Sequence, residues 1–279
     1  LRDDQSGNIK VVRHQVSNHI QLYPLPSEIE ETEFYNTDSQ AENIMGDTDL
    51  EVWWKKSIDD TQRRAKWLQS LVNAGKILDI GCGYGFFVDL LAQSNYDPVG
   101  IDVSAARIEL AKTHLKGNFL RGWIDDQEFI KANQEQFSAV TLFHVLEHIR
   151  NPTKFLQQCF EFVAPRGYLL IEVPNFDDEL LEQQPNYKNF YWQVAHLSYF
   201  TPSTLQYALS EAGLTQFTIR GVQRYGLRNL LHWLDHGKPQ LSAPSFQETQ
   251  PILQRLEELY KRDREERLTS DTLIVEVRK

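Results

Sequence analysis

Three glycines at alternate positions, set between two apolar runs, limit the fold of this chain more than any other feature. A short apolar run leads into Gly81, Gly83 and Gly85, an amphipathic stretch follows, and a second apolar run ends in Asp102. This order is typical of a nucleoside-binding unit in an open α/β sheet: a strand, a glycine turn, a helix, and a second strand with a carboxylate at its tip. The pattern therefore predicts a nucleoside-bearing cofactor beside this turn.

The glycine spacing distinguishes two classes of cofactor. Dinucleotide folds need a glycine where this chain has Phe86, so that helix and strand pack closely around a pyrophosphate. A bulky side chain there is unfavourable beside a pyrophosphate but tolerable beside S-adenosylmethionine (SAM), which has no phosphate. The glycines let the backbone approach the amino-acid tail of SAM, and Asp102 can accept hydrogen bonds from the ribose hydroxyls. An NAD-dependent oxidoreductase is disfavoured, and a glycine-rich turn without a ligand is the plainer alternative.

Several segments together resemble one family, the class I SAM-dependent methyltransferases. The matching segments are residues 77–85 (ILDIGCGYG), 100–104 (GIDVS), 137–152, 163–175 and 196–214. The last of these is similar to a segment of bacterial small-molecule methyltransferases, including quinone O-methyltransferases and sugar or surface-polysaccharide enzymes. The resemblance implies a Rossmann-like α/β fold, with seven mostly parallel strands, helices on both faces and an antiparallel last strand.

Hydrophobic periodicity predicts the same alternation of elements. Strands are expected at 77–80, 98–102, 118–121, 138–143, 168–173, 214–222 and 272–277, and helices at 61–74, 85–94, 104–115 and 152–164. Thr201 and Pro202 predict the start of a further helix, with threonine as the N-cap. Such alternation indicates a parallel sheet with right-handed crossovers.

The resemblance leaves two regions outside the core. We expect an N-terminal extension over residues 1–60, with a strand-like pattern at 8–23. A mixed helix and loop segment from 28 to 60 then either forms a lid or packs on the core. The core is expected at 61–221, with an aromatic substrate segment at 179–200, and the last strand lies within 271–279. Between them, 222–270 holds two helical patterns, and an insertion of this length usually has a function. The apolar side of its second helix suggests packing or a homodimer through 223–270.

Composition narrows the function. The formal net charge of −10 argues against nucleic acid as the substrate, because phosphate binding needs a basic surface. No apolar run approaches the ~20 residues of a membrane span, and the first residues lack a signal-peptide pattern. The two cysteines, Cys82 and Cys159, are expected to be buried thiols. These features predict a cytoplasmic enzyme, and the resemblance over 196–214 implies a small-molecule substrate.

The resemblance also implies which residues contact the cofactor. Asp79, Gly81, Cys82, Gly83 and Gly85 would surround the amino-acid tail, Asp102 the ribose and Val103 the adenine. Residues 123–125, which include Ile124 and Asp125, would close the adenine pocket, although the acidic contact is open between Asp125 and Asp126. Phe143 and His144 would lie near the methionine part.

Methyl transfer to a hydroxyl requires alignment and a base, and histidine is the usual base. His144 and His148 follow the fourth strand and share one face if that segment is helical. His148 is either the base or a hydrogen-bonding residue that holds the loop, and His196 is a second candidate. Glu147 and His148 alone would make a poor metal site, so no metal is expected.

Aromatic residues gather just after the fifth strand, in 187–200. Tyr191, Trp192 and Tyr199 are candidate substrate contacts, although core packing is the alternative for aromatic residues. Arg224 and Tyr225 are either contacts to an acidic or phosphorylated substrate or surface residues. We predict O-methylation of a sugar, nucleotide-sugar or secondary metabolite. The alternatives are N- or C-methylation and a catalytically silent SAM-fold binding or assembly protein.

Overall fold

A computed structural model describes residues 10–27, 50–193, 195–240 and 251–279. Its main sheet has the order β5-β4-β3-β6-β7-β10-β9. The strands are β3 (Gly75–Ile80), β4 (Tyr96–Asp102), β5 (Asn118–Arg121), β6 (Phe137–Phe143), β7 (Val163–Pro174), β9 (Phe217–Val222) and β10 (Thr272–Arg278). The strands from β5 to β7 pair in parallel, and β10 pairs antiparallel with both β7 and β9. The predicted fold class is confirmed.

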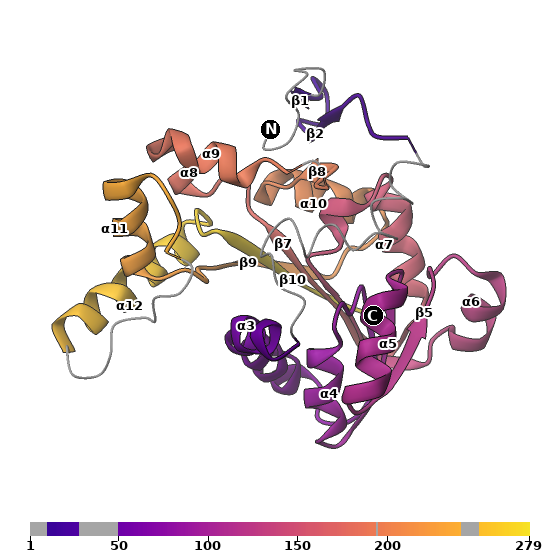
Figure 1. The fold of residues 1–279 in the computed structure, drawn as a ribbon. Coiled ribbons are helices and arrows are strands. Elements are labelled where there is room, and N and C mark those ends of the chain that lie inside the picture. Colours follow the sequence, from indigo (N-terminus) through magenta and orange to yellow (C-terminus); the bar gives the residue numbers. More distant parts are fainter. Residues whose placement is uncertain (1–9, 28–49, 194, 241–250) are drawn as a thin grey trace.

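Helices cover both faces of this sheet (Figure 1). The core helices are α3 (Leu50–Leu71), α4 (Phe86–Ala92), α5 (Ala105–His114), α6 (Gln127–Asn133), α7 (Pro152–Glu161) and α10 (Pro202–Glu211). Successive residues of β3 face the helix layers on the two sides of the sheet. Ile77 packs in the cluster that contains α3 and α4, and Leu78 packs in the cluster that contains α7 and α10. This period of two is what a strand buried on both faces requires.

Local capping explains where two of the predicted helices begin. The Ser104 hydroxyl accepts a hydrogen bond from the backbone N–H of Arg107 at the start of α5. At α10, Thr201 and Thr204 form a capping box, and Pro202 occupies the first turn. The helix expected at 61–74 is longer, since α3 already begins at Leu50, and it ends at Leu71.

A second, three-stranded sheet lies beside the core. Its strands are β1 (Lys10–Arg13), β2 (Ile20–Tyr23) and β8 (Ser198–Tyr199), all antiparallel. It packs with α8 (Glu179–Gln183) and α9 (Pro185–Tyr191) around an aromatic cluster. The strand-like pattern at 8–23 thus contains a two-stranded hairpin that pairs with the segment after the fifth parallel strand. Of the segment 28–60, expected as mixed helix and loop, residues 50–60 form the first part of α3, and residues 28–49 lie outside the described residues.

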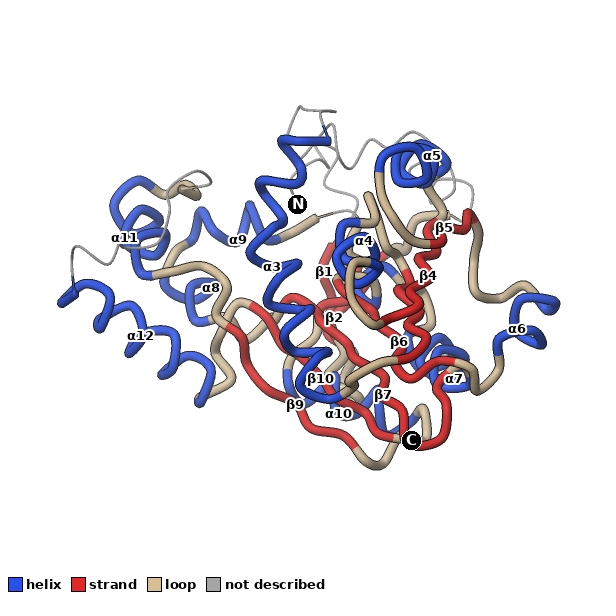
Figure 2. Tube along the Cα trace, turned by 90° about the horizontal axis from the view of Figure 1, so that it is seen from below, coloured by secondary structure: helices blue, strands red, loops and turns tan. Residues whose placement is uncertain are grey.

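Two further helices lie between β9 and β10. They are α11 (Leu227–His236) and α12 (Pro251–Glu266), and both project to the side of the sheet, beyond α8 and α9 (Figures 1 and 2). Among the described residues, no helix combines the length and apolar character needed to cross a membrane.

Candidate active site

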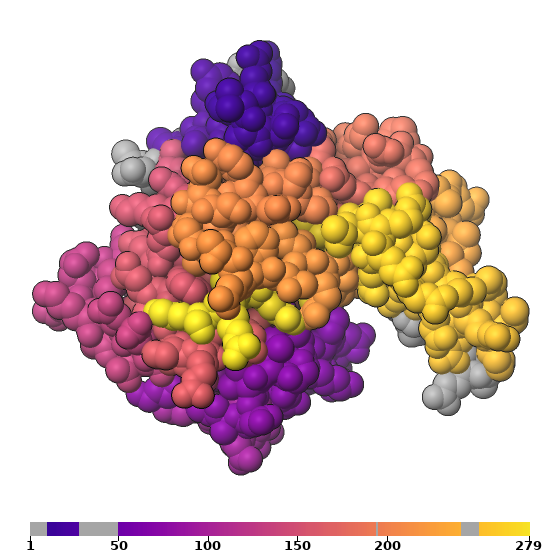
Figure 3. Space-filling model, turned by 180° about the vertical axis from the view of Figure 1, so that it is seen from behind, coloured from indigo at the N-terminus to yellow at the C-terminus, as the bar shows by residue number. Residues whose placement is uncertain are grey.

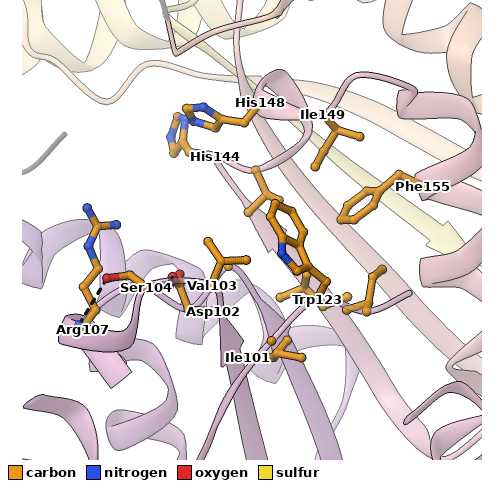
Figure 4. A pocket seen from close by; sticks show the side chains of 15 residues that line it. Ile101, Asp102, Val103, Ser104, Arg107, Trp123, His144, His148, Ile149 and Phe155 are labelled. Atoms are coloured by element: carbon orange, nitrogen blue, oxygen red, sulfur yellow. Dashed lines mark hydrogen bonds between the residues drawn. The ribbon is translucent and has the colours of Figure 1, made fainter. Parts of the chain in front are cut away.

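A pocket opens at the carboxyl ends of β3, β4 and β6 (Figure 4). It encloses about 830 Å³, a volume that includes its open mouth. Among the predicted site residues, its lining contains Gly81, Asp102, Val103, Ile124, His144 and His148. Parallel α/β sheets bind their ligands in this crevice, because the connections from two neighbouring strands lead to opposite faces of the sheet there.

The Asp102 carboxylate connects the glycine turn to the start of α5. One oxygen accepts a hydrogen bond from the backbone N–H of Gly83 at 2.9 Å, and the other accepts from the backbone N–H of Ser104 at 2.9 Å. Each oxygen retains a further lone pair, which can receive a ribose hydroxyl. Asp102 therefore fits a nucleoside at this wall of the pocket.

The glycines of the turn have different roles. At Gly83, with a φ of +56°, an added Cβ would meet nothing within 4 Å, so this turn is open on that side. At Gly85, with a φ of +82°, an added Cβ would lie 2.4 Å from the Phe119 ring. The expectation that the glycines admit the cofactor tail therefore fits Gly83, whereas Gly85 is required by packing and by its left-handed backbone.

Phe86 does not face the pocket, and this corrects the physical reason given for excluding a dinucleotide. Its ring lies 5.2 Å from Trp54 of α3 and 6.0 Å from Tyr84, measured between centroids. The side chain is buried beneath α3. Phe86 thus marks the packing of the helix against α3 rather than the absence of a phosphate.

Asp79 lies deeper, at the end of β3. It is 4% exposed, and its carboxylate accepts a hydrogen bond from the Thr141 hydroxyl at 2.6 Å. Burial raises the pKa of Asp79 to about 7, although the Thr141 hydrogen bond opposes the shift. A cationic group nearby would favour the ionised form, so this carboxylate fits a position close to the ammonium of an amino-acid tail.

The adenine end of the pocket includes Trp123, the first residue of the predicted stretch 123–125. Trp123 lines the pocket while 52% exposed, next to the buried Ile124. A large exposed aromatic at the mouth of a pocket is a candidate for stacking on a base. Asp125 is exposed and outside the lining, and Asp126 accepts a hydrogen bond from the N–H of Phe129 as the N-cap of α6.

His144 is held through both ring nitrogens. Its Nδ1 lies 3.2 Å from Oε1 of Glu147, and its Nε2 lies 3.1 Å from Oε1 of Glu172. Burial lowers the pKa of His144, but hydrogen bonds with these two carboxylates outweigh burial and raise it. A φ of +57°, unusual for a residue other than glycine, places the ring at this turn. Both ring nitrogens of His144 thus contact carboxylates, which disfavours the role of base that was predicted for it.

His148 and His196 have a different environment. The rings pack edge to face with centroids 4.9 Å apart. His148 Nδ1 donates a hydrogen bond to the carbonyl of Ala195 at 2.8 Å, so the lone pair of the neutral ring is on Nε2. Burial lowers the pKa of His148 and lowers that of His196 to about 3, so both rings are neutral near pH 7.

Glu147 joins these rings in a cluster of possible metal ligands. One ligand atom from each of Glu147, His148 and His196 lies within 4.8 Å of the others. Burial opposes ionisation of Glu147, but its hydrogen bond with His144 prevails and lowers the pKa to about 2. Among the described residues, Oε2 of Glu147, Nδ1 of His196 and the buried hydroxyl of Tyr191 have no hydrogen-bond partner. The sequence did not reveal this third ligand, because His196 follows a different strand.

Several predicted contacts lie away from the pocket. The Phe143 ring packs in the core, 5.0 Å from Phe87. Tyr191 and Tyr199 are buried in the aromatic cluster, and the ring of Trp192 lies 4.8 Å from that of Tyr199. The core alternative therefore describes Tyr199, whose hydroxyl donates a hydrogen bond to the carbonyl of Gln193.

Arg224 is already paired with other residues of the chain. Its Nε donates to both oxygens of Asp60, at 3.1 and 3.0 Å, and its Nη1 lies 3.1 Å from Nε2 of His144. The neighbouring Tyr225 is 42% exposed, and the Arg224 guanidinium lies 5.5 Å from its ring centroid. With Asp60 as its partner, Arg224 is not available to neutralise a phosphorylated substrate.

Comparison with known proteins identifies the family. The family described as "Methyltransferase domain" matches residues 55–218, and the chain belongs to it. SAM is the cofactor that this family and its fold imply, and the pocket described above fits it. The chain is 31% identical over 134 residues to a protein named ubiquinone biosynthesis O-methyltransferase from Pseudomonas fluorescens (strain Pf0-1), which covers 44% of this chain and 58% of the relative.

Other relatives cover more of the chain at lower identity. A ubiquinone biosynthesis O-methyltransferase from Coxiella burnetii (strain Dugway 5J108-111) is 26% identical over 181 residues, covering 60% of this chain and 75% of that protein. Among solved structures, a SAM-dependent methyltransferase from Archaeoglobus fulgidus superposes with a TM-score of 0.58 at 17% identity, covering 87% of this chain and 99% of that one. At this identity the structural likeness establishes the fold alone.

Proposed function

We propose that this protein transfers the methyl group of SAM to a hydroxyl oxygen of a small molecule, a sugar, nucleotide-sugar or secondary metabolite. The observation that carries the proposal is the pocket that places the Asp102 carboxylate and the neutral His148 ring on one lining. The name of the Pseudomonas fluorescens relative supports oxygen as the acceptor atom. A cytoplasmic location, pairing of two chains and a substrate other than nucleic acid remain predictions.

Different residues would bind the different parts of SAM. Asp102 would hold the ribose, the open turn at Gly83 and the Asp79 carboxylate would receive the amino-acid tail, and Trp123 and Val103 would lie against the adenine. When bound, SAM supplies an activated methyl group on a sulfonium. Holding the acceptor oxygen in line with that methyl group can contribute about 7–11 kcal/mol.

His148 would accept the proton of the acceptor hydroxyl. Its donor bond to Ala195 leaves Nε2 as the basic atom, and the Glu147 carboxylate would stabilise the imidazolium that forms. His196, packed against His148, is the second candidate base. A neutral amine acceptor, or a silent binding protein, would not need this base, whereas a carbon acceptor would still have to lose a proton.

Isothermal titration with SAM, S-adenosylhomocysteine and NADH tests the proposal. We expect SAM to bind, and Asp102→Asn to weaken its binding by roughly 10–100-fold, because one charged acceptor is lost. Asp97→Asn, an exposed aspartate at the opposite end of β4, is the matched control and should bind SAM normally. Tight binding of NADH without SAM binding would overturn the proposal, and radiolabelled methyl transfer to a panel of acceptors would identify the substrate.

The cluster of Glu147, His148 and His196 supports a second mechanism, in which a metal ion takes the place of the base. A divalent ion held by these ligands would lower the pKa of an acceptor hydroxyl and replace the base. If so, chelation should abolish methyl transfer, added divalent ions should restore it, and His196→Ala should lose bound metal in elemental analysis. Full activity in chelator would exclude this mechanism and leave the histidine base.

A further inference from the structure

Tyr84 lies in the glycine turn, residues 81–85, with a glycine on either side. Gly83 and Gly85 both have positive φ values, +56° and +82°. Glycine restrains the backbone less than any other residue, so a turn of this composition needs other contacts to keep one shape. Tyr84 places a large side chain at the point where the backbone is least restrained.

Backbone hydrogen bonds hold the side of the turn that faces β4. The N–H of Gly81 donates to the carbonyl of Ile101 at 2.8 Å. The N–H of Gly83 donates to an oxygen of Asp102 at 2.9 Å. The Tyr84 ring is half-buried and lies outside the hydrophobic core clusters of the described residues, so its contacts act on the turn from another side.

The Tyr84 ring contacts two helices that are distant in the sequence. The ring of Trp53, on α3, lies 5.4 Å from it between centroids, and the guanidinium of Arg107, on α5, lies 5.5 Å from its centroid. The Lys56 ammonium lies 5.5 Å from the Trp53 centroid. Aromatic rings attract one another in offset geometry, and cations are attracted to ring faces. We call this row of side chains the Tyr84 stack: Lys56, Trp53, Tyr84 and Arg107.

Aromatic contacts also hold the first half of α3. The buried residues of this helix lie in its second half: Thr61, Ala65, Trp67 and Leu68. The first half contacts the turn through Trp53 and the start of α4 through Trp54, whose ring lies 5.2 Å from that of Phe86. The two helices lie side by side in the lower part of the molecule (Figures 1 and 3). The stack therefore joins α3 to the turn in a region where α3 has no buried residue.

Arg107 connects the stack with the wall of the pocket. It lines the pocket together with Asp102 and Ser104, at the start of α5 (Figure 4). Its backbone N–H donates to the Ser104 hydroxyl, and the Ser104 N–H donates to Asp102. The glycine turn and α5 are thus joined twice, through the Asp102 carboxylate and through the contact of Tyr84 with Arg107.

We propose that Tyr84 is a positioning residue for SAM. Its ring, held between Trp53 and Arg107, keeps the glycine turn in the shape that receives the amino-acid tail. This inference rests on the proposed cofactor site, in which Asp102 binds the ribose and the turn at Gly83 receives the tail. A turn that already has its bound shape loses less conformational entropy on binding, so the affinity is higher.

Isothermal titration of the full chain with two ligands tests the proposal. S-adenosylhomocysteine has the amino-acid tail, and 5′-methylthioadenosine has the same nucleoside without that tail. Tyr84→Ala should weaken the binding of S-adenosylhomocysteine roughly tenfold and change that of 5′-methylthioadenosine little, because Asp102 still holds the ribose. Tyr84→Phe keeps the ring and should restore the affinity. Tyr207→Ala, which removes an exposed tyrosine of α10, is the matched control and should bind both ligands normally.

A second variant tests the stack without a change in the turn. Trp53→Ala removes one partner of the Tyr84 ring, and we expect the same selective loss of affinity for S-adenosylhomocysteine. Thermal unfolding of each variant without ligand shows whether it is folded. If Tyr84→Ala is unfolded, Trp53→Ala decides the result.

Three results would overturn the proposal. They are normal binding of S-adenosylhomocysteine by the folded variants, an equal loss of affinity for the two ligands, and a Tyr84→Phe variant that binds as weakly as Tyr84→Ala. Asp102→Asn separates this outcome from a failure of the cofactor site. If Asp102→Asn binds both ligands normally, the proposed site is wrong and this inference falls with it. If Asp102→Asn weakens both ligands while Tyr84→Ala weakens neither, the role of Tyr84 alone is wrong.

Discussion

At the residue scale, neighbouring histidines differ because their surroundings differ. His144 lies between two carboxylates, which raise its pKa, while His148 and His196 are buried with pKa values shifted downward. A base must be neutral before the reaction and basic enough to accept a proton. Both ring nitrogens of His144 contact carboxylates, and a pKa of about 3 makes His196 a weak acceptor, so the environment favours His148. Residue type and spacing in the FHVLEH segment could not distinguish them.

The pH profile of methyl transfer tests this assignment. The rate should fall as pH decreases through the pKa of His148, with a midpoint below the ordinary 6.5, since protonation removes the accepting lone pair. His148→Ala should reduce kcat by roughly 10²–10⁴-fold and remove this acid limb. A profile unchanged in both His148→Ala and His196→Ala would eliminate the histidine base.

At the element scale, a buried ion cluster connects α3 to the sheet. Glu172 of β7 is fully buried. Its carboxylate oxygens lie 2.8 Å from the Arg63 guanidinium, 2.6 Å from that of Arg64, and in contact with the His144 ring. Burial opposes ionisation of Glu172, but the Arg64 and His144 contacts outweigh it and lower the pKa well below its usual range. This cluster fixes α3 to β7 near the carboxyl ends of the strands, where the pocket opens.

Removing the central charge should destabilise the protein strongly. Glu172→Gln leaves two arginines near a neutral amide, and we expect a loss of about 3–5 kcal/mol in the free energy of unfolding, measured in urea. Glu51→Gln removes an exposed pair with Lys55 on the same helix and should change stability little. Equal stabilities for the two variants would show that the cluster does not hold α3.

At the scale of the whole molecule, buried acids make stability depend on pH. Burial and the charge of Asp271 raise the pKa of Asp178 to about 7. This group joins α8 to α9, because the Tyr187 hydroxyl donates a hydrogen bond to it at 2.8 Å. Its folded pKa exceeds the ordinary 3.8, so the folded state keeps a proton that the unfolded chain has released.

Asp178→Asn should therefore gain stability relative to the unaltered protein as pH rises. The proton held by Asp178 makes the unaltered protein lose stability between about pH 4 and 7, and the asparagine removes this loss. The difference in unfolding temperature should grow over that range and level off above it. A difference independent of pH would mean that Asp178 is ionised throughout.

By itself, the sequence determined the sheet and its strand alternation, and it predicted where the candidate cofactor site lies. These depend on local patterns: a period of two in β3, a capping serine before α5, and glycines followed by Asp102 within one βαβ unit. Each signal lies within about thirty residues, so periodicity and turn chemistry suffice to recognise it.

Only the tertiary structure decided which side chains share the site. His196 contacts His148 from the loop between α9 and β8, Arg224 pairs with Asp60 of α3, and Tyr199 lies in the core. The direction of these side chains depends on partners far along the chain, whose burial and charge set each pKa. Several large apolar side chains of α12 are likewise exposed, since helical periodicity defines a stripe but not the direction it faces.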